Sequence, residues 1–231
     1  MIRYIVASCK TWHRKEFERV SDNMLGHWLY VATQAELDKA VRDIAPRYIF
    51  FLHWNWVVPI ELWSQHECVC FHMTDVPYGR GGSPLQNLIL AGHAETKVTA
   101  LRMVDEMDAG PVYAKRAMSL DGRAEEIYLR AGYLCWEMIR WMISSKPVPM
   151  AQNGKVTKFI RRKPEQSVLP DQCDLVGIYD HIRMLDAPTY PLAFIDFGDF
   201  RLEFSHAELK LDEVSAQVIF KKLKKTNVYG K

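Results

Sequence analysis

Residues 68–86 read Cys-Val-Cys-Phe-His-Met-Thr-Asp-Val-Pro-Tyr-Gly-Arg-Gly-Gly-Ser-Pro-Leu-Gln. The apolar run Cys68–Phe71 is typical of a buried strand, and it is followed at once by His72. The irregular residues that come next end at Ser83, which can cap a helix whose first turn holds Pro84. This stretch therefore predicts a strand, a glycine-containing loop and a helix in succession.

The preceding sequence shows the same alternation of apolar runs and helical segments. Further apolar runs lie at Ile2–Ala7, Trp28–Val31 and Tyr48–His53. Between the last two, Thr33 can cap a helix, with Glu36 at the capping-box position. Apolar strands separated by helices indicate an α/β fold with a Rossmann-like, mostly parallel sheet. Because ligands gather at the carboxyl ends of such strands, we expect the functional residues just after these runs.

The rest of the chain predicts a small second unit. Two more strands and a long helix precede a proline-rich stretch, which reads as a connector with a short strand near Val156–Ile160. Beyond it, a helix and a hairpin turning at Gly198-Asp199 predict a small C-terminal lobe. The predicted boundaries are 1–150 for the catalytic domain, 151–173 for the connector and 174–231 for the lobe.

Composition indicates a globular protein: 231 residues, 48% hydrophobic and 25% charged, with a net charge of +2. No apolar run approaches the ~18–20 residues of a membrane span, and the N-terminus does not resemble a secretory signal. The five cysteines form no C-x-x-C pair, which favours reduced thiols in the cytoplasm over disulfides or a metal cage. We therefore expect a cytoplasmic protein without metal or membrane contacts.

Lysines crowd near the end of the chain, at Lys221, Lys222, Lys224, Lys225 and Lys231. A solvated helix end or tail explains such a cluster, and an anionic partner is the alternative.

Two segments carry candidate chemistry. His72 ends a predicted strand beside a loop with Gly79, Gly81 and Gly82, where a ligand can approach closely. These glycines do not have the spacing of a P-loop or a dinucleotide fingerprint. The second segment, residues 103–111, is an acidic loop ending in Gly-Pro.

The order of motifs is more specific than any one of them. The chain has His72, then Pro-x-x-Arg-Gly-x-x-Pro from Pro77, Glu-Thr-x-Val-Thr from Glu95, and Asp-x-Gly-Pro from Asp108. This order resembles the folate-dependent formyltransferase family, which includes enzymes acting on methionyl-tRNA, glycinamide ribonucleotide and sugar nucleotides. The resemblance is densest over residues 48–115.

Within that family, residues 72–86 most resemble the sugar-nucleotide enzymes of pseudaminic-acid type pathways. Residues 178–191 are similar to the second lobe of the formyltransferase for 4-amino-4-deoxy-arabinose nucleotide. The resemblance thus implies transfer of a formyl group from N10-formyltetrahydrofolate to the amino group of a nucleotide-linked amino-deoxy sugar. It also implies a candidate homodimer through the second lobe. The net charge of only +2 leads us to expect no nucleic-acid partner.

The resemblance assigns His72 and Asp108 to catalysis. A positioned imidazole can move protons and stabilise a developing oxyanion, and a carboxylate beside it favours the charged imidazole. The family normally has Asn two residues before the His, where this chain has Cys70. Asn55 is our candidate for the missing amide; the alternative is that His72 acts with backbone donors. Cys70 as a covalent nucleophile is a further alternative, which the apolar run around it disfavours.

By the same resemblance, the pterin contacts come from Trp56, Val57 and Val58 and from the loop Val104, Asp105, Glu106, Met107 and Asp108. Gly82 can contribute a backbone contact only. Each of these candidate substrate residues has a surface or packing role as its alternative: Lys10, Trp12, His13, Arg80, Arg183 and Tyr190. For Arg80 the alternative is to brace the loop against a carboxylate.

Three other functions stay open. A hydrolase that releases formate from the same folate would use similar groups. Methionyl-tRNA formyltransferase is disfavoured by the short chain and modest positive charge. A non-catalytic folate- or nucleotide-binding module is suggested by the absence of Asn at position 70, and an anion-binding protein by the lysine-rich end.

Overall fold

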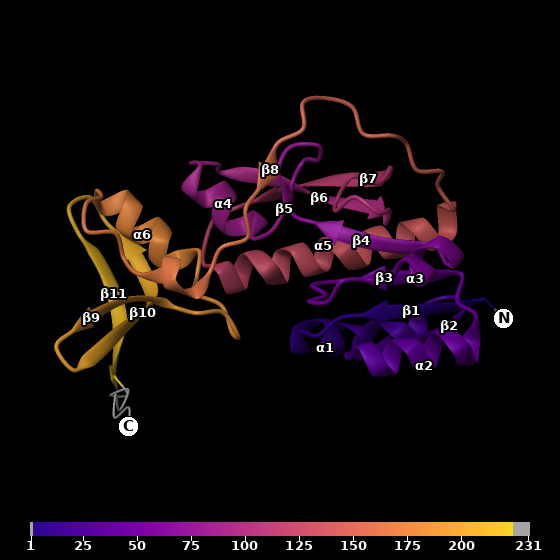
Figure 1. Cartoon of the computed structure of the whole chain (residues 1–231), viewed down its shortest axis with the longest axis horizontal. Coiled ribbons are helices and arrows are strands. Elements are labelled where there is room, and N and C mark those ends of the chain that lie inside the picture. The colour runs from indigo at the N-terminus through magenta and orange to yellow at the C-terminus, as the bar shows by residue number, and fades with distance from the viewer. Residues whose placement is uncertain (1, 224–231) are drawn as a thin grey trace, which may run out of the picture. The chain divides into compact units, whose positions relative to one another are not determined.

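The computed structural model describes residues 2–223, and its main feature is a six-stranded sheet with the order β2-β1-β3-β4-β6-β7 (Figure 1). The strands from β2 to β4 are parallel to one another, β6 runs antiparallel to them, and β7 pairs antiparallel with β6 and so has the same direction as β4. This confirms the predicted mostly parallel α/β sheet. The strands are β1 (Arg3–Ala7), β2 (His27–Val31), β3 (Tyr48–Phe51), β4 (Cys68–His72), β6 (Glu95–Arg102) and β7 (Val112–Ser119).

Helices lie between the strands from β1 to β6 along the chain, and α5 follows β7. The predicted cap of α2 is present, because the Thr33 hydroxyl accepts a hydrogen bond from the Glu36 N–H at 3.2 Å. The Glu36 carboxylate in turn accepts from the Ala32 N–H at 2.6 Å. The helical elements are α1 (Thr11–Val20), η1 (Ser21–Asn23), α2 (Gln34–Ile44), α3 (Ile60–Gln65), α4 (Pro84–Leu90) and α5 (Ala124–Ser145).

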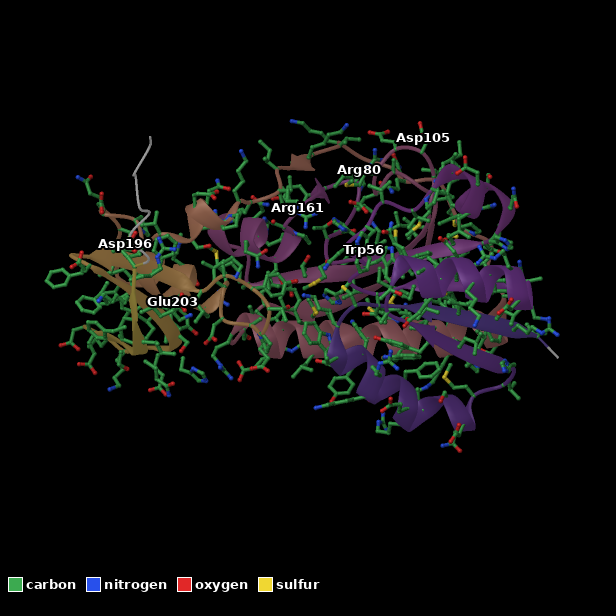
Figure 2. The ribbon with its side chains drawn as sticks, turned by 60° about the horizontal axis from the view of Figure 1, so that its bottom comes forward. Trp56, Arg80, Asp105, Arg161, Asp196 and Glu203 are labelled. Atoms are coloured by element: carbon green, nitrogen blue, oxygen red, sulfur yellow. The ribbon has the colours of Figure 1, made fainter. Side chains whose placement is uncertain are left out.

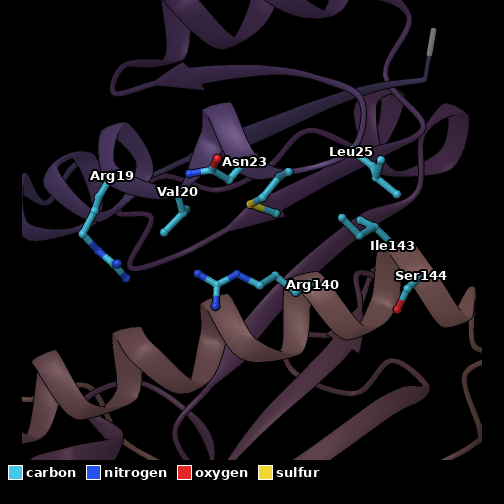
Figure 3. Close-up of a pocket in the computed structure, with 8 residues that line it drawn as sticks. Arg19, Val20, Asn23, Leu25, Arg140, Ile143 and Ser144 are labelled. Carbon is cyan, nitrogen blue, oxygen red and sulfur yellow. The ribbon is translucent and has the colours of Figure 1, made fainter.

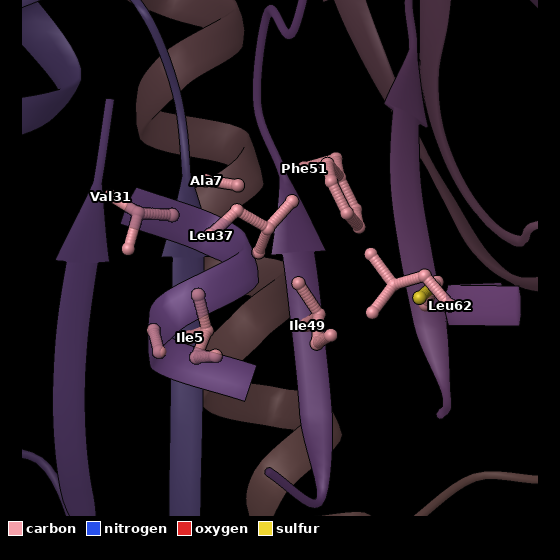
Figure 4. Packing of buried hydrophobic residues seen from close by; sticks show 9 residues of the cluster. Ile5, Ala7, Val31, Leu37, Ile49, Phe51 and Leu62 are labelled. Atoms are coloured by element: carbon pink, nitrogen blue, oxygen red, sulfur yellow. The ribbon is translucent and has the colours of Figure 1, made fainter. Parts of the chain in front are cut away.

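The core on one face of the sheet is built from alternate strand residues. Ile5 and Ile49 are fully buried, and Leu37 of α2 and Leu62 of α3 pack against them. Figure 4 shows α2 in front of these strands and α5 behind them. Because both faces are covered, the strands are apolar along their whole length, which is why their sequences lack alternation.

A short parallel pair forms at the connector. Arg80–Gly81 (β5) pairs with Lys158–Phe159 (β8), so the glycine loop after His72 receives a partner strand from the connector. Gly81 has φ +109°, and a Cβ there would lie 2.4 Å from the Phe159 carbonyl oxygen. Only glycine fits this position without displacing the connector.

The chain forms two compact units. The first comprises residues of Met1–Pro84, Glu95–Ser119 and Tyr128–Ile160, and the second those of Leu85–Ala94, Leu120–Ile127 and the described part of Arg161–Lys231.

The second unit contains a helix and a three-stranded antiparallel sheet of order β11-β10-β9. The predicted helix and hairpin are present, and a third strand joins them. This strand was not predicted because its end is lysine-rich. Lys221 lies on β11 with its Nζ 2.6 Å from Glu203 of β10, so for Lys221 and Lys222 the helix-end interpretation is wrong. The other three lysines of that cluster lie outside the described residues. The elements are η2 (Pro164–Ser167), α6 (Leu175–Arg183), β9 (Ala193–Phe197), β10 (Phe200–Leu209) and β11 (Val214–Lys222).

Within residues 2–223, no helix combines the length and apolarity that crossing a bilayer requires.

Candidate active site

His72 is the last residue of β4 and is held by the loop that follows it. The ring is buried, and its Nε2 lies 2.8 Å from the Gly79 carbonyl oxygen. A carbonyl oxygen only accepts, so Nε2 carries the proton and the neutral ring has its lone pair on Nδ1. That Nδ1 atom lies 3.6 Å from Oδ2 of Asp108. The structure therefore brings together the two residues that the motif order predicts for catalysis.

Asp108 is held in an uncommon backbone conformation. Its φ is +54°, in the left-handed region that Asp tolerates better than most residues. Its Oδ2 accepts a hydrogen bond from the Gly81 N–H at 2.9 Å, so the carboxylate is directed toward the glycine loop and His72. Gly110 packs against the neighbouring strand, where an added Cβ would lie 1.7 Å from the Arg102 carbonyl oxygen.

Arg80 is held by several contacts within the protein. Its guanidinium is nearly buried and donates to Oε1 of Gln152 from Nε at 3.1 Å and from Nη2 at 2.9 Å. Its Nη1 lies 3.6 Å from the Glu106 carboxylate, which also pairs with Lys158 at 3.0 Å. Of the two roles predicted for Arg80, these contacts support bracing the loop.

Asn55 and Cys70 differ in exposure. Asn55 is exposed in the segment after β3, and none of the contacts among residues 2–223 joins it to His72 or Asp108. Cys70 is partly buried and packs against the core cluster of β1 and β3. Burial raises the pKa of the Cys70 thiol, and the Asp108 carboxylate raises it further. A neutral thiol is a poor nucleophile, so the Cys70 alternative is disfavoured.

The predicted folate contacts are apolar side chains that remain accessible. Val57 and Met107 are exposed to 83% and 66%, and Trp56 to 38%. Val58 and Met103, which belong to or precede these two segments, both pack on the core cluster. Figure 2 shows Trp56 and Asp105 on these two segments. Accessible apolar groups of this kind fit a flat heterocycle.

The remaining predicted folate contacts are polar or backbone groups. Asp105 and Glu106 are exposed, Val104 is exposed to 37%, and Gly82 is partly buried. The Lys158 ammonium, and then Arg80, lower the pKa of the Glu106 carboxyl. Glu106 is therefore already paired within the protein.

His13 is misassigned as a substrate contact. It is 1% exposed, and its Nε2 lies 2.8 Å from Nδ1 of His53. Burial and the neighbouring His53 hold the pKa of His13 well below its usual range. Burial likewise lowers the pKa of His53, to about 4. Residue type alone could not show that this imidazole points inward from α1.

Lys10 and Trp12 belong to the same cluster. Trp12 stacks on Tyr128 with ring centroids 6.3 Å apart, and the Lys10 ammonium lies 5.6 Å from the Trp12 ring. Lys10 is nearly buried, and burial lowers its pKa. Both residues therefore pack within the first unit.

Arg183 is also misassigned as a substrate contact. Its Nη1 donates to the carbonyls of Leu120 and Gly122 at 2.6 and 3.0 Å, and its Nε to Asp180 at 2.6 Å. These bonds hold the second unit together. Tyr190 is partly exposed in the same unit, and its N–H donates to the Ala187 carbonyl.

Two cavities lie away from the catalytic pair. One of about 350 Å³ lies between α1, η1 and the end of α5, where Arg19 and Arg140 extend into the space between the helices (Figure 3). Another of about 420 Å³ lies at the amino ends of β1 and β3, beside Tyr4 and Tyr48. Neither includes a predicted catalytic or folate-contacting residue.

No three His, Cys, Asp or Glu side chains among residues 2–223 are placed to hold a metal ion.

Gln152 was missed by sequence reasoning. Besides accepting from Arg80, it donates from Nε2 to the carbonyls of Asp108 and Gly110, each at 2.8 Å. The sequence around Gln152 gave no signal, because this proline-rich part of the connector precedes the predicted short strand and has no helical or strand periodicity of its own.

Residues 164–221 match the family model described as the C-terminal domain of methionyl-tRNA formyltransferase. A solved methionyl-tRNA formyltransferase from Clostridium thermocellum is 42% identical, with a TM-score of 0.92 over 96% of this chain and 100% of that chain. The methionyl-tRNA formyltransferase of Magnetococcus marinus is 31% identical over 170 residues, which are 70% of this chain and 54% of the relative.

The chain thus spans about half the length of the curated relatives it matches. A structure of HypX from Aquifex aeolicus in complex with tetrahydrofolic acid shares the fold, at 17% identity and a TM-score of 0.74 over 89% of this chain and 38% of that chain.

These relatives correct the predicted partner. The family resemblance implied a nucleotide-linked amino sugar, and the low net charge suggested no nucleic acid. The relatives with substantial identity are instead methionyl-tRNA formyltransferases, so that prediction is wrong. Chain length and net charge misled here, because both describe the whole chain and neither describes a binding surface.

Proposed function

The chain belongs to the folate-dependent formyltransferase family, and on that premise we propose that it transfers a formyl group from N10-formyltetrahydrofolate to the amino group of methionyl-tRNA. The observation that carries the proposal is the approach of His72 Nδ1 to Asp108 Oδ2, at 3.6 Å, at the carboxyl end of β4. The methionyl-tRNA acceptor is taken from the relatives' activity.

The roles of the two residues follow from their hydrogen bonds. With the His72 Nε2 proton held by Gly79, Nδ1 is the atom that can accept a proton from the attacking amine. The ring then becomes positively charged, and the Asp108 carboxylate stabilises that charge. When the bond from the formyl carbon to the folate nitrogen breaks, the charged ring can give the proton to that nitrogen as it leaves. Because Asp108 also accepts from Gly81, its carboxylate is already oriented before substrates bind.

The formyl oxygen gains negative charge as the amine adds, and it requires a hydrogen-bond donor. We assign this role to the Asn55 amide, which is exposed after β3 and free of contacts with the catalytic pair among residues 2–223. In this proposal the bound folate supplies the activated formyl carbon. Trp56, Val57 and Met107 provide the apolar surface that holds its ring.

Formyl transfer to charged initiator tRNA is the direct test. The purified chain is incubated with N10-formyltetrahydrofolate and methionyl-tRNA, and formylmethionyl-tRNA is measured by mass spectrometry after nuclease digestion. We expect formylated product from the wild type and none from His72→Ala.

Three outcomes would overturn the proposal. Release of formate without product would indicate a hydrolase. Folate binding without turnover would indicate a binding module. Formylation of another amine, with charged tRNA left unmodified, would reject the acceptor and keep the reaction.

A further inference from the structure

Gln152 joins three segments of the first unit that are distant in sequence. Its Oε1 accepts two hydrogen bonds from Arg80, at 3.1 and 2.9 Å. Its Nε2 donates to the carbonyl oxygens of Asp108 and Gly110, both at 2.8 Å. Both ends of this one neutral amide, the acceptor and the donor, are therefore used on fixed partners.

These bonds close a ring around Asp108. Arg80 precedes Gly81, whose N–H donates to Oδ2 of Asp108 at 2.9 Å. The Asp108 carboxylate therefore bonds directly to the Arg80–Gly81 segment. The Asp108 backbone carbonyl is linked to the same segment through Gln152. Because Asp108 has φ +54°, its backbone is in a conformation that the surrounding contacts must hold.

Other connector residues hold the same two loops. The Arg80 N–H donates to the Thr157 carbonyl at 3.0 Å, within the β5–β8 pair. The Lys158 ammonium lies 3.0 Å from Glu106, which precedes Asp108 by two residues. Residues 152–158 thus contact both the glycine loop after His72 and the loop 103–111 that holds Asp108. Among the bonds described for these connector residues, only those of Gln152 reach the Asp108 backbone.

We propose that Gln152 is a positioning residue for formyl transfer. It holds the Asp108 carbonyl and thereby keeps the Asp108 carboxylate against His72 Nδ1. The role rests on the proposed function of that site. An amide suits this place because it accepts from a guanidinium and donates to two carbonyls at the same time.

The discriminating variant is Gln152→Glu. An ionised carboxylate has the same shape and accepts more strongly from Arg80, but it cannot donate to Asp108 and Gly110. Gln152→Met has similar length and makes neither set of bonds. The matched control is Gln166→Glu. Gln166 also lies in the predicted connector 151–173, but it is exposed, and its side-chain oxygen accepts from the Lys163 N–H at 2.7 Å.

The kinetic expectation separates positioning from binding. In Gln152→Glu and Gln152→Met, kcat falls about 10- to 100-fold, because a displacement of about 1 Å at a reacting group can have an effect of that size. The KM for N10-formyltetrahydrofolate changes by less than about threefold. Gln166→Glu behaves as wild type.

Backbone amide exchange provides a readout that needs no turnover. In the unliganded protein, Gln152→Glu should speed exchange at Gly81 and in residues 104–111 more than in the rest of the first unit. A wild-type kcat in Gln152→Glu, or a raised KM with kcat unchanged, would overturn the positioning role. If the wild type itself transfers no formyl group, the proposed function fails, and unchanged exchange in Gln152→Glu then rejects the positioning role separately.

Discussion

The Nδ1 atom of His72 lies 3.6 Å from Oδ2 of Asp108, although α4 and β6 separate the two residues along the chain. The distance is longer than a hydrogen bond, so the neutral ring is near the carboxylate without donating to it. Protonation of Nδ1 would add a donor and a positive charge, and both would draw the pair together. The arrangement is suited to a base that becomes charged during the reaction.

Asp108→Asn tests that electrostatic role. The variant amide oxygen can still accept from the Gly81 N–H, so the loop keeps its anchor while the negative charge is lost. We expect kcat to fall by roughly 10²–10⁴-fold, as for loss of a general acid–base contribution. Steady-state kinetics with methionyl-tRNA measure the effect, and a kcat within about threefold of the wild type would show that the charge at Asp108 is dispensable.

A second pair of variants tests the oxyanion-donor role of Asn55 and the nucleophile role of Cys70. Removing an oxyanion donor lowers kcat by about 10²–10³-fold in other enzymes, and we expect a loss of this size for Asn55→Ala. Cys70→Ser should retain activity, because burial keeps this thiol neutral. Near-normal turnover in Asn55→Ala, beside an inactive His72→Ala, would reject the Asn55 assignment. An inactive Cys70→Ser with an intact fold would revive the covalent alternative.

Acid should destabilise the first unit through the His13–His53 pair. Burial lowers the pKa of His53 from 6.5 to about 4 and holds that of His13 low as well. Between pH 6.5 and 4 the unfolded chain therefore binds more protons than the folded chain, so the free energy of unfolding decreases as the pH falls. Denaturant midpoints measured at several pH values should show this slope.

The control for that slope is a pair of further variants. The double variant His13→Leu, His53→Leu should have a flatter pH dependence, because both titrating groups are removed. His27→Gln alters an exposed imidazole and should leave the slope unchanged. Equal slopes in the wild type and the double variant would contradict the interpretation.

Arg183→Met should weaken the second unit. Methionine keeps the apolar stem of the side chain but leaves the carbonyls of Leu120 and Gly122 without their donor. We expect a loss of about 2–4 kcal/mol in the free energy of unfolding, the sum of a few unsatisfied buried groups. The KM for either substrate should not change, whereas a raised KM with normal stability would restore the predicted substrate role.

Arg201→Met is the surface control for this experiment. Arg201 pairs with Asp196 at 2.8 Å, and both side chains are more than a third exposed. An exposed pair contributes less than about 1 kcal/mol, so this variant should remain near wild-type stability.

The sequence predicted the parts of the fold that depend on periodicity. Apolar runs located the strands of the sheet, and the order of motifs located His72 and Asp108. It predicted a short strand near Val156–Ile160, where β8 lies, but it did not predict β5 or the β5–β8 pairing, because a two-residue strand has no periodicity and its partner is far away in the chain. It also misassigned His13 and Arg183, since a polar residue type does not show whether its side chain points into the core or toward a ligand.

The β5–β8 pair has a consequence for the history of the gene. A side chain at Gly81 would collide with the backbone of Phe159. Gln152 and Lys158 contact the loop that holds Asp108. Residues up to Ile160 therefore belong structurally with the first unit. Recombination that exchanged C-terminal lobes with a crossover at residue 150 would bring in a foreign strand against the glycine loop. A crossover after Ile160 would leave that contact intact, so viable hybrids between relatives should share breakpoints in the segment that follows β8.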